Sequence, residues 1–311
     1  MVAGGSSGSG LCTTLAFARQ GADLVLAARS AKSLAETAAD CLADGGTAIT
    51  VPTDVGSASA VDDLFAAAER RFGRIDVVVN SAAAVGYGRF EDVPADVFDR
   101  VMTTNITGTA NVARTALRYF RAAGSGDLIL VGSLLGKIAV PYMSPYVTSK
   151  WAVHGLARIL QIEARETPGI NISVVSPGSV NTPAYAQAAN YSGWQGRPPP
   201  PVDPPEKVAR AILRAVDNPQ RDRSVGVLNG FQILGFRLLP GVYDLLVTPL
   251  VKVVALSRKQ IEPGPYSAFE PLPGGDAEYG EWGRHWLRGI AAAALTGAAA
   301  GTAVLRGWRR R

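Results

Sequence analysis

The chain has 311 residues, of which 47% are hydrophobic and 18% charged, so it can bury a sizeable core and is not intrinsically disordered. Two cysteines, Cys12 and Cys41, exclude a disulfide framework, and two histidines, His154 and His285, are too few for a histidine-rich metal site. We therefore expect no metal. The net charge of +5 is mild, and no basic stripe is interleaved with aromatic residues, so we expect no nucleic-acid partner.

Short apolar runs alternate with longer helical segments over about the first 180 residues. The runs are rich in β-branched residues and predict strands at 24–28, 48–51, 75–79, 128–131 and 172–175. The segments between them predict crossover helices at 31–44, 58–72, 95–121 and 145–167. Continuous apolar strands are typical of a parallel sheet that is buried on both faces. The sequence therefore predicts an α/β fold with a doubly wound, Rossmann-like parallel sheet.

The character of the sequence changes after residue 182. Residues 184–205 are rich in Pro and Gly and predict a loop, and 204–217 predict one further helix. Residues 225–256 are apolar, with interruptions at Arg237, Pro240, Asp244 and Pro249, and residues 262–285 predict an extended segment. We expect a catalytic, NADP-binding domain over 1–230, an apolar substrate-region extension over 231–285 and a tail helix over 286–311.

The tail contains sixteen uncharged residues, 290–305, in which small residues recur every four positions. A membrane span needs about 17–25 residues, so this run is short for one. A soluble tail helix, a disordered tail and a membrane anchor through 286–311 remain alternatives. Nothing at the amino terminus is typical of a signal peptide, which predicts a cytoplasmic protein, either free or membrane-associated.

The chain opens on a glycine-rich stretch that is followed by an apolar helical segment. Such a turn lets a backbone approach a pyrophosphate at the positive end of a helix, although flexible linkers share the composition. The strand at 24–28 favours the βαβ interpretation, in which the turn residues bind the cofactor; they are Gly4, Ser6, Ser7, Gly8 and Gly10. Only Met1 and Val2 precede the turn motif, so we expect that residues of the first strand are missing.

Arg29 follows the second predicted strand, where a carboxylate binds the ribose of NAD and an arginine suits the 2′-phosphate of NADP. This position predicts a preference for NADP(H), with NAD(H) as the alternative. The competing interpretation is an ordinary arginine beside a helix.

Tyr146 and Lys150 are four residues apart, on one face of a helix that should begin with Ser144 as its N-cap and Pro145 at its first position. Ser133 follows a strand and should lie at the carboxyl edge of the sheet. A phenol has an ordinary pKa of about 10, and a nearby lysine and a positive nicotinamide ring favour its ionised form. A serine hydroxyl can hold the substrate oxygen while hydride is transferred. The three residues predict an alcohol/carbonyl oxidoreductase.

Over about residues 1–230 the sequence resembles the short-chain dehydrogenase/reductase family. The matching motifs, in order, are Ala3-Gly4…Gly8-Ser9-Gly10, Asp54-Val55, Asn80-Ser81-Ala82-Ala83, Thr104-Asn105-Ile106-Thr107-Gly108 and Pro177-Gly178-Ser179-Val180-Asn181-Thr182, beside Ser133, Tyr146 and Lys150. Where the family has Thr, Asn and Gly, this chain has Ala3, Ser81 and Ala83. These departures lie in segments that brace the cofactor site.

The resemblance implies a role for each matching residue. Tyr146 would be the acid/base, Lys150 would also hold the nicotinamide ribose, Ser133 would position the substrate oxygen, and Asn105 would organise a water in the proton relay. The remaining implied cofactor-binding residues are Asp54, Val55, Asn80, Pro177, Gly178, Val180 and Thr182. Tyr142 lacks a lysine four residues later and is not the catalytic tyrosine. The resemblance also implies a homodimer or homotetramer.

Aromatic and aliphatic residues are frequent where the family shapes its substrate pocket, which predicts an apolar alcohol or ketone as substrate; they are Tyr185, Tyr191, Trp194, Phe231, Ile233, Leu234, Phe236 and Leu238. Packing within a core is the alternative explanation for them. The expected activity is NADP(H)-dependent interconversion of a secondary alcohol and a ketone. A catalytically silent, cofactor-sensing binding protein and an epimerase or dehydratase of the same fold are the alternatives.

Overall fold

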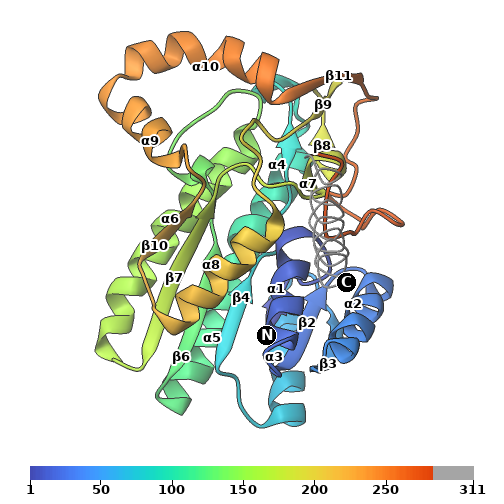
Figure 1. Ribbon diagram of the computed structural model, residues 1–311, viewed down its shortest axis with the longest axis vertical. Coiled ribbons are helices and arrows are strands. Elements are labelled where there is room, and N and C mark those ends of the chain that lie inside the picture. The colour runs from blue at the N-terminus through green and yellow to red at the C-terminus, as the bar shows by residue number, and fades with distance from the viewer. Residues whose placement is uncertain (283–311) are drawn as a thin grey trace, which may run out of the picture. The chain divides into compact units, whose positions relative to one another are not determined.

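Seven parallel strands form the central sheet of the computed structural model, which describes residues 1–282. Their order is β10-β7-β6-β4-β1-β2-β3, with the first strand inside the sheet between β4 and β2 (Figure 1). The bounds are β1 (Val2–Ala3), β2 (Asp23–Ala28), β3 (Thr47–Pro52), β4 (Val77–Asn80), β6 (Gly126–Val131), β7 (Ile170–Pro177) and β10 (Asp222–Val225). This arrangement confirms the predicted doubly wound α/β fold.

Helices cover both faces of the sheet. They are α1 (Gly8–Ala18), α2 (Ala31–Ala43), α3 (Ala58–Phe72), α4 (Ala95–Met102), α5 (Gly108–Ala123), α6 (Ser144–Glu163) and α8 (Pro205–Asp217). On one face, apolar side chains of α3 and α5, such as Phe65 and Phe120, pack against Val78 and Leu128 of the sheet. On the other face, α8 covers β1, β4, β6 and β7, and Ile212 is fully buried there. Strands buried on both faces explain why the β-branched runs were legible in the sequence.

The first strand is short, as the sequence indicated. Although β1 contains only two residues, it pairs with both β2 and β4. The amide of Val79 donates to the carbonyl of Met1 at 2.9 Å, and the amide of Ser81 donates to that of Ala3 at 2.8 Å. These bonds place the glycine turn at the carboxyl edge of the sheet.

The single long helix expected at 95–121 is divided into α4 and α5 by a π-helical turn, Thr103–Thr107. A π turn widens the helix by one residue and is frequent at functional sites. Gly108 follows at once, and a Cβ there would lie 2.5 Å from Cγ2 of Val55. The glycine therefore lets the start of α5 approach the segment that follows β3.

The chain beyond β7 contains more regular structure than expected. Within 184–205, predicted as loop, lie the short elements α7 (Ala184–Gln187), β8 (Ala189–Asn190) and β9 (Trp194–Gly196). Backbone pairing fixes them: β8 pairs with β5 (Gly86–Tyr87), and β9 pairs with β11 (Leu256–Gln260). These strands are only two to five residues long, and the partner of each lies far away in the sequence, so local composition does not reveal them.

Two helices project from the body beside the sheet, α9 (Asn229–Leu238) and α10 (Pro240–Val254) (Figure 1). Pro240 begins α10, where a missing amide is harmless, whereas Pro249 lies inside α10 and does not end it. Arg237 and Asp244 are exposed and do not interrupt the helices.

No helix within residues 1–282 is long and apolar enough to cross a membrane. The predicted tail helix, 286–311, with its uncharged run at 290–305, lies outside the described residues. Residues 262–281 contain turns and a bridge between Asn190 and Gly264, without a helix or strand. We call residues 262–281 the strap.

Candidate active site

A cavity of about 640 Å³ lies at the carboxyl ends of the central strands. Gly4 follows β1 there, Arg29 follows β2, and Ser133 follows β6. Most of the predicted site residues line this cavity: Gly4, Ser6, Ser7, Gly8, Arg29, Asp54, Val55, Ser133, Tyr146, Lys150, Pro177, Gly178, Val180 and Thr182. The predicted residues Gly10, Asn80 and Asn105 do not line it.

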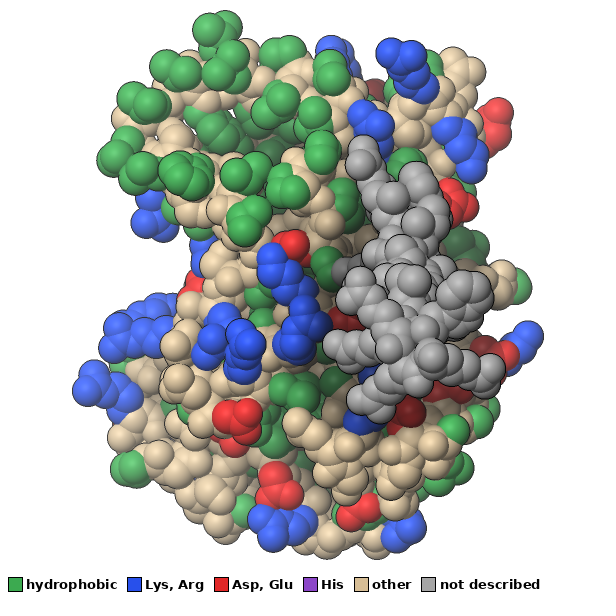
Figure 2. Space-filling view, in the orientation of Figure 1, with side chains coloured by type: hydrophobic (Ala, Val, Ile, Leu, Met, Phe, Trp, Pro, Cys, Tyr) green, Lys and Arg blue, Asp and Glu red, His purple; other side chains and the backbone are tan. Residues whose placement is uncertain are grey.

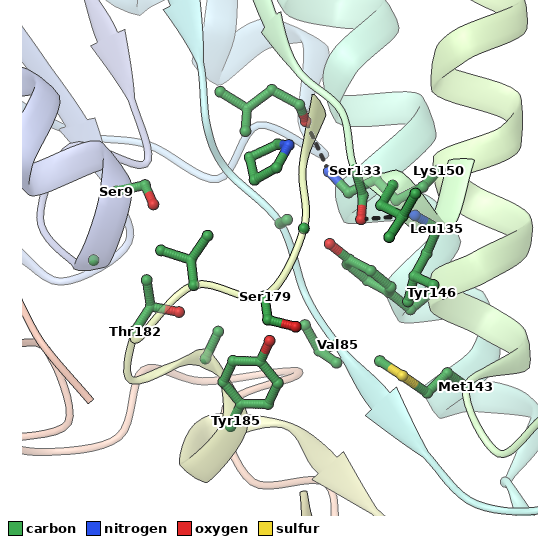
Figure 3. Close-up of a pocket in the computed structure, with 18 of the residues that line it drawn as sticks. Ser9, Val85, Ser133, Leu135, Met143, Tyr146, Lys150, Ser179, Thr182 and Tyr185 are labelled. Atoms are coloured by element: carbon green, nitrogen blue, oxygen red, sulfur yellow. Dashed lines mark hydrogen bonds between the residues drawn. The ribbon is translucent and has the colours of Figure 1, made fainter. Parts of the chain in front are cut away.

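Ser133, Tyr146 and Lys150 lie along one wall of the cavity (Figure 3), with Ser179, Thr182 and Tyr185 opposite. The Lys150 ammonium donates to the carbonyl of Val131 at 2.9 Å and lies 5.6 Å from the centroid of the Tyr146 ring. The Ser133 hydroxyl accepts a hydrogen bond from the amide of Leu135 at 3.1 Å. The three side chains are thus held by strand β6 and helix α6 at fixed positions.

Burial controls the ionisation of this set. It raises the pKa of Tyr146, and a hydrogen bond with Ser133 partly offsets that rise. Lys150 is only 3% exposed, and burial lowers its pKa from 10.5 to about 8. A lysine with a pKa near 8 is easily deprotonated, so it can exchange a proton close to neutral pH. The arrangement can therefore deliver a proton to, or remove one from, an oxygen placed between Ser133 and Tyr146.

The π turn places Asn105 behind the catalytic helix. Its side-chain amide accepts from the amide of Ala84 at 2.7 Å, and donates to the carbonyl of Ala84 at 2.9 Å and to the hydroxyl of Ser149 at 2.8 Å. Asn105 is 1% exposed. It therefore ties the segment after β4 to the helix that carries Tyr146 and Lys150.

Helix α6 begins differently from the sequence prediction. Ser144 was expected to be the N-cap, but it is the first helical residue, and Met143 occupies the cap position without a side-chain bond. The hydroxyl of Ser144 is buried and has no hydrogen-bond partner among residues 1–282. Tyr142 lies in the preceding turn with a φ of 65°, and Lys252 stacks over its ring. Tyr142 is not among the residues that line the cavity.

The glycine turn packs so closely against itself and against the segment after β4 that a side chain would not fit at Gly4 or Gly10. A Cβ on Gly10 would lie 1.9 Å from the carbonyl oxygen of Gly4, and one on Gly4 would lie 2.6 Å from the amide nitrogen of Ala82. Gly8 begins α1 and lines the cavity, so the positive end of this helix lies at the cavity. The residues present therefore fit a dinucleotide cofactor.

At the adenine end, the predicted residues are bonded to other parts of the chain. Asp54 pairs with Arg100 at 2.6 Å. Burial would raise the pKa of Asp54, but hydrogen bonds from Arg100 and from the amide of Gly56 outweigh it and lower the pKa. Asn80 lies outside the cavity and donates to the hydroxyl of Thr109 at 2.9 Å, which braces α5 against β4.

Arg29 donates three hydrogen bonds to the strap. Its guanidinium reaches the carbonyls of Ser267 at 2.6 Å, Ala268 at 3.0 Å and Phe269 at 2.8 Å. The carbonyl of Ala268 also accepts from Arg100 at 3.1 Å. Sequence reasoning missed this contact, because backbone carbonyls carry no side-chain signal.

The strap then crosses the pyrophosphate turn (Figure 1, orange to red). The amide of Gly8 donates to the carbonyl of Ala277 at 2.8 Å, and the hydroxyl of Ser6 donates to Asp276 at 3.2 Å. Asp276 also lines the cavity. The strap therefore accepts hydrogen bonds from the Gly8 amide and the Ser6 hydroxyl, two groups that the sequence assigned to cofactor binding.

A polar cluster supports the backbone of Ser133 from outside the cavity. It was not predicted from the sequence. Nε2 of His154 lies 3.2 Å from the carbonyl oxygen of Ser133. Asp222 lies next to it, paired with Lys137 at 2.5 Å and accepting from Ser176 at 2.7 Å. Burial lowers the pKa of His154 despite the neighbouring carboxylate. The imidazole therefore holds the backbone that carries Ser133.

The comparisons with known proteins agree with this geometry. A family model described as short chain dehydrogenase matches residues 1–191. An uncharacterized oxidoreductase, YxnA of Bacillus subtilis, is 33% identical over 81% of this chain and 71% of its own length. A D-beta-hydroxybutyrate dehydrogenase of Rhizobium meliloti is 31% identical over 59% of this chain and 71% of its own length.

Among solved structures, an alcohol dehydrogenase from the archaeon Thermococcus sibiricus, complexed with 5-hydroxy-NADP, matches with a TM-score of 0.61 and 27% identity. The match covers 72% of this chain and 93% of that one. The family match and the parallel sheet indicate the same family. So does the presence of Ser133, Tyr146 and Lys150 in one cavity. The chain belongs to the short-chain dehydrogenase/reductase family and is an NAD(P)-dependent oxidoreductase that acts on CH–OH groups.

Proposed function

We propose that the protein interconverts a secondary alcohol and a ketone of apolar character, with NADP(H) as its cofactor. The observation that carries the proposal is one cavity that combines a polar wall with apolar side chains from α10. The polar wall contains Ser133, Tyr146 and Lys150. The same cavity is lined by Leu239, which precedes α10, and by Val242, Leu246 and Leu250 within α10. A carbonyl can therefore reach Ser133 while an apolar substituent lies against α10.

In this proposal the hydroxyls of Ser133 and Tyr146 hold the substrate oxygen, and Tyr146 donates or accepts its proton. The bound nicotinamide supplies or accepts the hydride. Lys150 moves a proton to or from Tyr146 through its low pKa and holds the nicotinamide ribose. Asn105 holds the helix that carries this pair through its bond to Ser149. In the same proposal it organises a water in the proton relay.

Arg29 supports the preference for NADP(H). It is the basic residue that follows β2 and lines the cavity, and no carboxylate follows β2 there. A 2′-phosphate can accept the hydrogen bonds that the guanidinium now donates to three strap carbonyls. The structural relative with a bound NADP derivative is consistent with this assignment.

The proposal includes a division of the chain into a catalytic domain (1–230), a substrate-region extension (231–285) and a tail (286–311). It also includes assembly into a homodimer or homotetramer. Trp151, Ile159 and Ile162 are exposed on α6 and give an apolar strip that a second copy would cover. Light scattering coupled to size exclusion measures the assembly directly.

The test is oxidation of NADPH by the purified chain with a panel of ketones whose apolar substituents increase in length. We expect turnover that rises with substituent length, and a loss of at least about a hundredfold in Tyr146→Phe with cofactor binding retained. Cofactor binding without turnover on any ketone would instead indicate a sensing protein. Turnover that Tyr146→Phe leaves unchanged would exclude this site as the catalytic one.

A further inference from the structure

The α9–α10 hairpin (Asn229–Val254) presents an apolar surface to solvent. Figure 2 shows hydrophobic side chains gathered over these two helices at the top of the molecule. The exposed large side chains of this region are Val227, Leu228, Phe231, Leu234, Leu238, Leu239, Val242, Leu245, Leu246, Leu250 and Val253. Phe231 and Leu245 are each 75% exposed. Contiguous apolar patches of this kind are rare on monomeric soluble proteins and mark interaction surfaces.

The hairpin buries very little of itself against the body. Among the side chains of α10 only Val251 is buried, and in α9 only Asn229. Phe236 stacks edge-on with Trp151 and Tyr243, and the Tyr243 hydroxyl donates to the carbonyl of Ala139 at 2.7 Å. These contacts fix the position of the hairpin and leave its outer apolar face uncovered.

This outer surface is continuous with the wall of the catalytic cavity. Leu239, Val242, Leu246 and Leu250 are each more than half exposed, and the same four side chains line the cavity. Whatever covers the patch therefore also lies at an apolar opening to the cavity.

Basic residues lie beside the patch. Arg237 and Lys252 belong to the hairpin, and Arg197, Arg258 and Lys259 lie near the end of α10. Figure 2 shows Lys and Arg side chains beside the hydrophobic ones at the top of the view. Within residues 1–282 none of these five forms an ion pair with a carboxylate. The acidic residues of the same region are Asp244 and Glu262.

We propose that the α9–α10 hairpin docks on the surface of a bilayer that contains anionic phospholipids. The exposed leucine and phenylalanine side chains enter the acyl-chain boundary, and the basic residues contact the phosphate headgroups. A second copy of the chain fits less well, because it would bring together two sets of cations that have no carboxylate partner within residues 1–282. A fluid hydrocarbon layer covers the apolar side chains and still leaves the cavity open to lipophilic molecules. The docking goes beyond the proposed function, since it requires no turnover.

Sedimentation of the full chain with phospholipid vesicles tests the proposal. We expect binding to vesicles of phosphatidylcholine with phosphatidylglycerol, and binding at least about tenfold weaker to phosphatidylcholine alone or in high salt. Leu245→Glu should weaken binding at least about tenfold, because it places a charge among acyl chains. Leu42→Glu is the matched control: Leu42 is 61% exposed on α2, so its replacement makes the same charge change away from the hairpin and should leave binding unchanged.

A second measurement locates the contact even where another part of the chain also binds lipid. Both native cysteines are buried, so a cysteine introduced as Leu245→Cys or Asp63→Cys accepts an environment-sensitive dye selectively. On anionic vesicles the dye at 245 should shift to shorter wavelength and brighten, whereas the dye at 63, an exposed position of α3, should not.

Equal vesicle binding by Leu245→Glu and Leu42→Glu, or a dye at 245 that keeps its aqueous spectrum on bound protein, would overturn the proposal. The proposal would also be overturned if the wild-type chain did not bind vesicles and Leu245→Glu converted it from a larger to a smaller assembly in size exclusion. That result would assign the patch to a protein interface.

Discussion

The two ends of the cofactor groove are built differently. At the catalytic end, Ser133, Tyr146 and Lys150 are positioned by strand β6, helix α6 and the buried Asn105. At the adenine end, Arg29 and the amide of Gly8 are bonded to the strap. Under the proposed function, a preorganised catalytic site would need no rearrangement at the moment of reaction, whereas a cofactor would exchange contacts with the strap before it bound Arg29 and Gly8. The proposal therefore predicts that substitutions at the first end change the rate and that substitutions at the second end change cofactor affinity.

The largest effect is expected at the catalytic end. Ser133→Ala removes the hydroxyl that bonds Tyr146 and is proposed to hold the substrate oxygen. We expect kcat to fall by about 10²–10³ while the dissociation constant of NADPH stays the same. Steady-state kinetics and cofactor fluorescence measure the two quantities separately.

Ser144→Ala provides the matched control, since the hydroxyl of Ser144 is buried and has no partner within the described residues. It should leave both kcat and cofactor binding intact. If both serine variants lost activity equally, the effect would come from the start of α6 rather than from the hydroxyl of Ser133.

The buried Lys150 should also make stability depend on pH. Lowering its pKa from 10.5 to about 8 corresponds to a cost of about 3 kcal/mol below pH 8, where the ammonium is buried in the folded state. Between pH 8 and 10.5 the unfolded chain binds more protons than the folded one, so this cost disappears as pH rises. Lys150→Met should therefore stabilise the free protein at pH 7 and lose that advantage by pH 10.5.

Urea unfolding of both chains across this range measures the difference, and Lys32→Met, at an exposed position, should change stability by less than about 0.5 kcal/mol at any pH. A difference between wild type and Lys150→Met that is the same at pH 7 and pH 10.5 would exclude a buried ammonium.

A smaller effect is expected at the adenine end. Arg29→Asp removes the guanidinium proposed to bind the 2′-phosphate and introduces a carboxylate that suits ribose hydroxyls. We expect the affinity for NADPH to fall at least about tenfold and that for NADH to stay equal or rise. Titration of both cofactors into both chains measures the ratio. An unchanged NADPH-to-NADH ratio would remove Arg29 from cofactor selection.

The grouping of Tyr146 and Lys150 could be predicted from the sequence, and the contacts of the strap could not. Tyr146 and Lys150 are one helical turn apart, so their spacing alone places them together. The contact between Arg29 and Ser267 joins residues 238 positions apart and uses a carbonyl that any residue could supply. Short strands such as β8 and β9 escaped prediction for the same reason, because distant backbone pairing holds them.

Local rules also failed at two points of detail. Ser144 has the composition of an N-cap, yet it lies inside α6 because the preceding turn, with Tyr142 at a positive φ, starts the helix one residue earlier. Pro249 was expected to interrupt the apolar segment, yet α10 continues through it. In both places the surrounding structure overrides the preference of a single residue.

Hydrogen exchange of the full chain, with and without NADPH, tests the difference between the two ends most directly. The amides of Ser267 and Gly280 donate to the carbonyls of Gln187 and Asn181, which anchors the strap. If the cofactor replaces the Ala277 carbonyl as the acceptor for the amide of Gly8, the strap is released. These strap amides should then exchange faster with NADPH bound, while amides of α6 stay as protected as before. Slower or unchanged exchange in the strap would contradict the account, because the strap would then keep its place beside the bound cofactor.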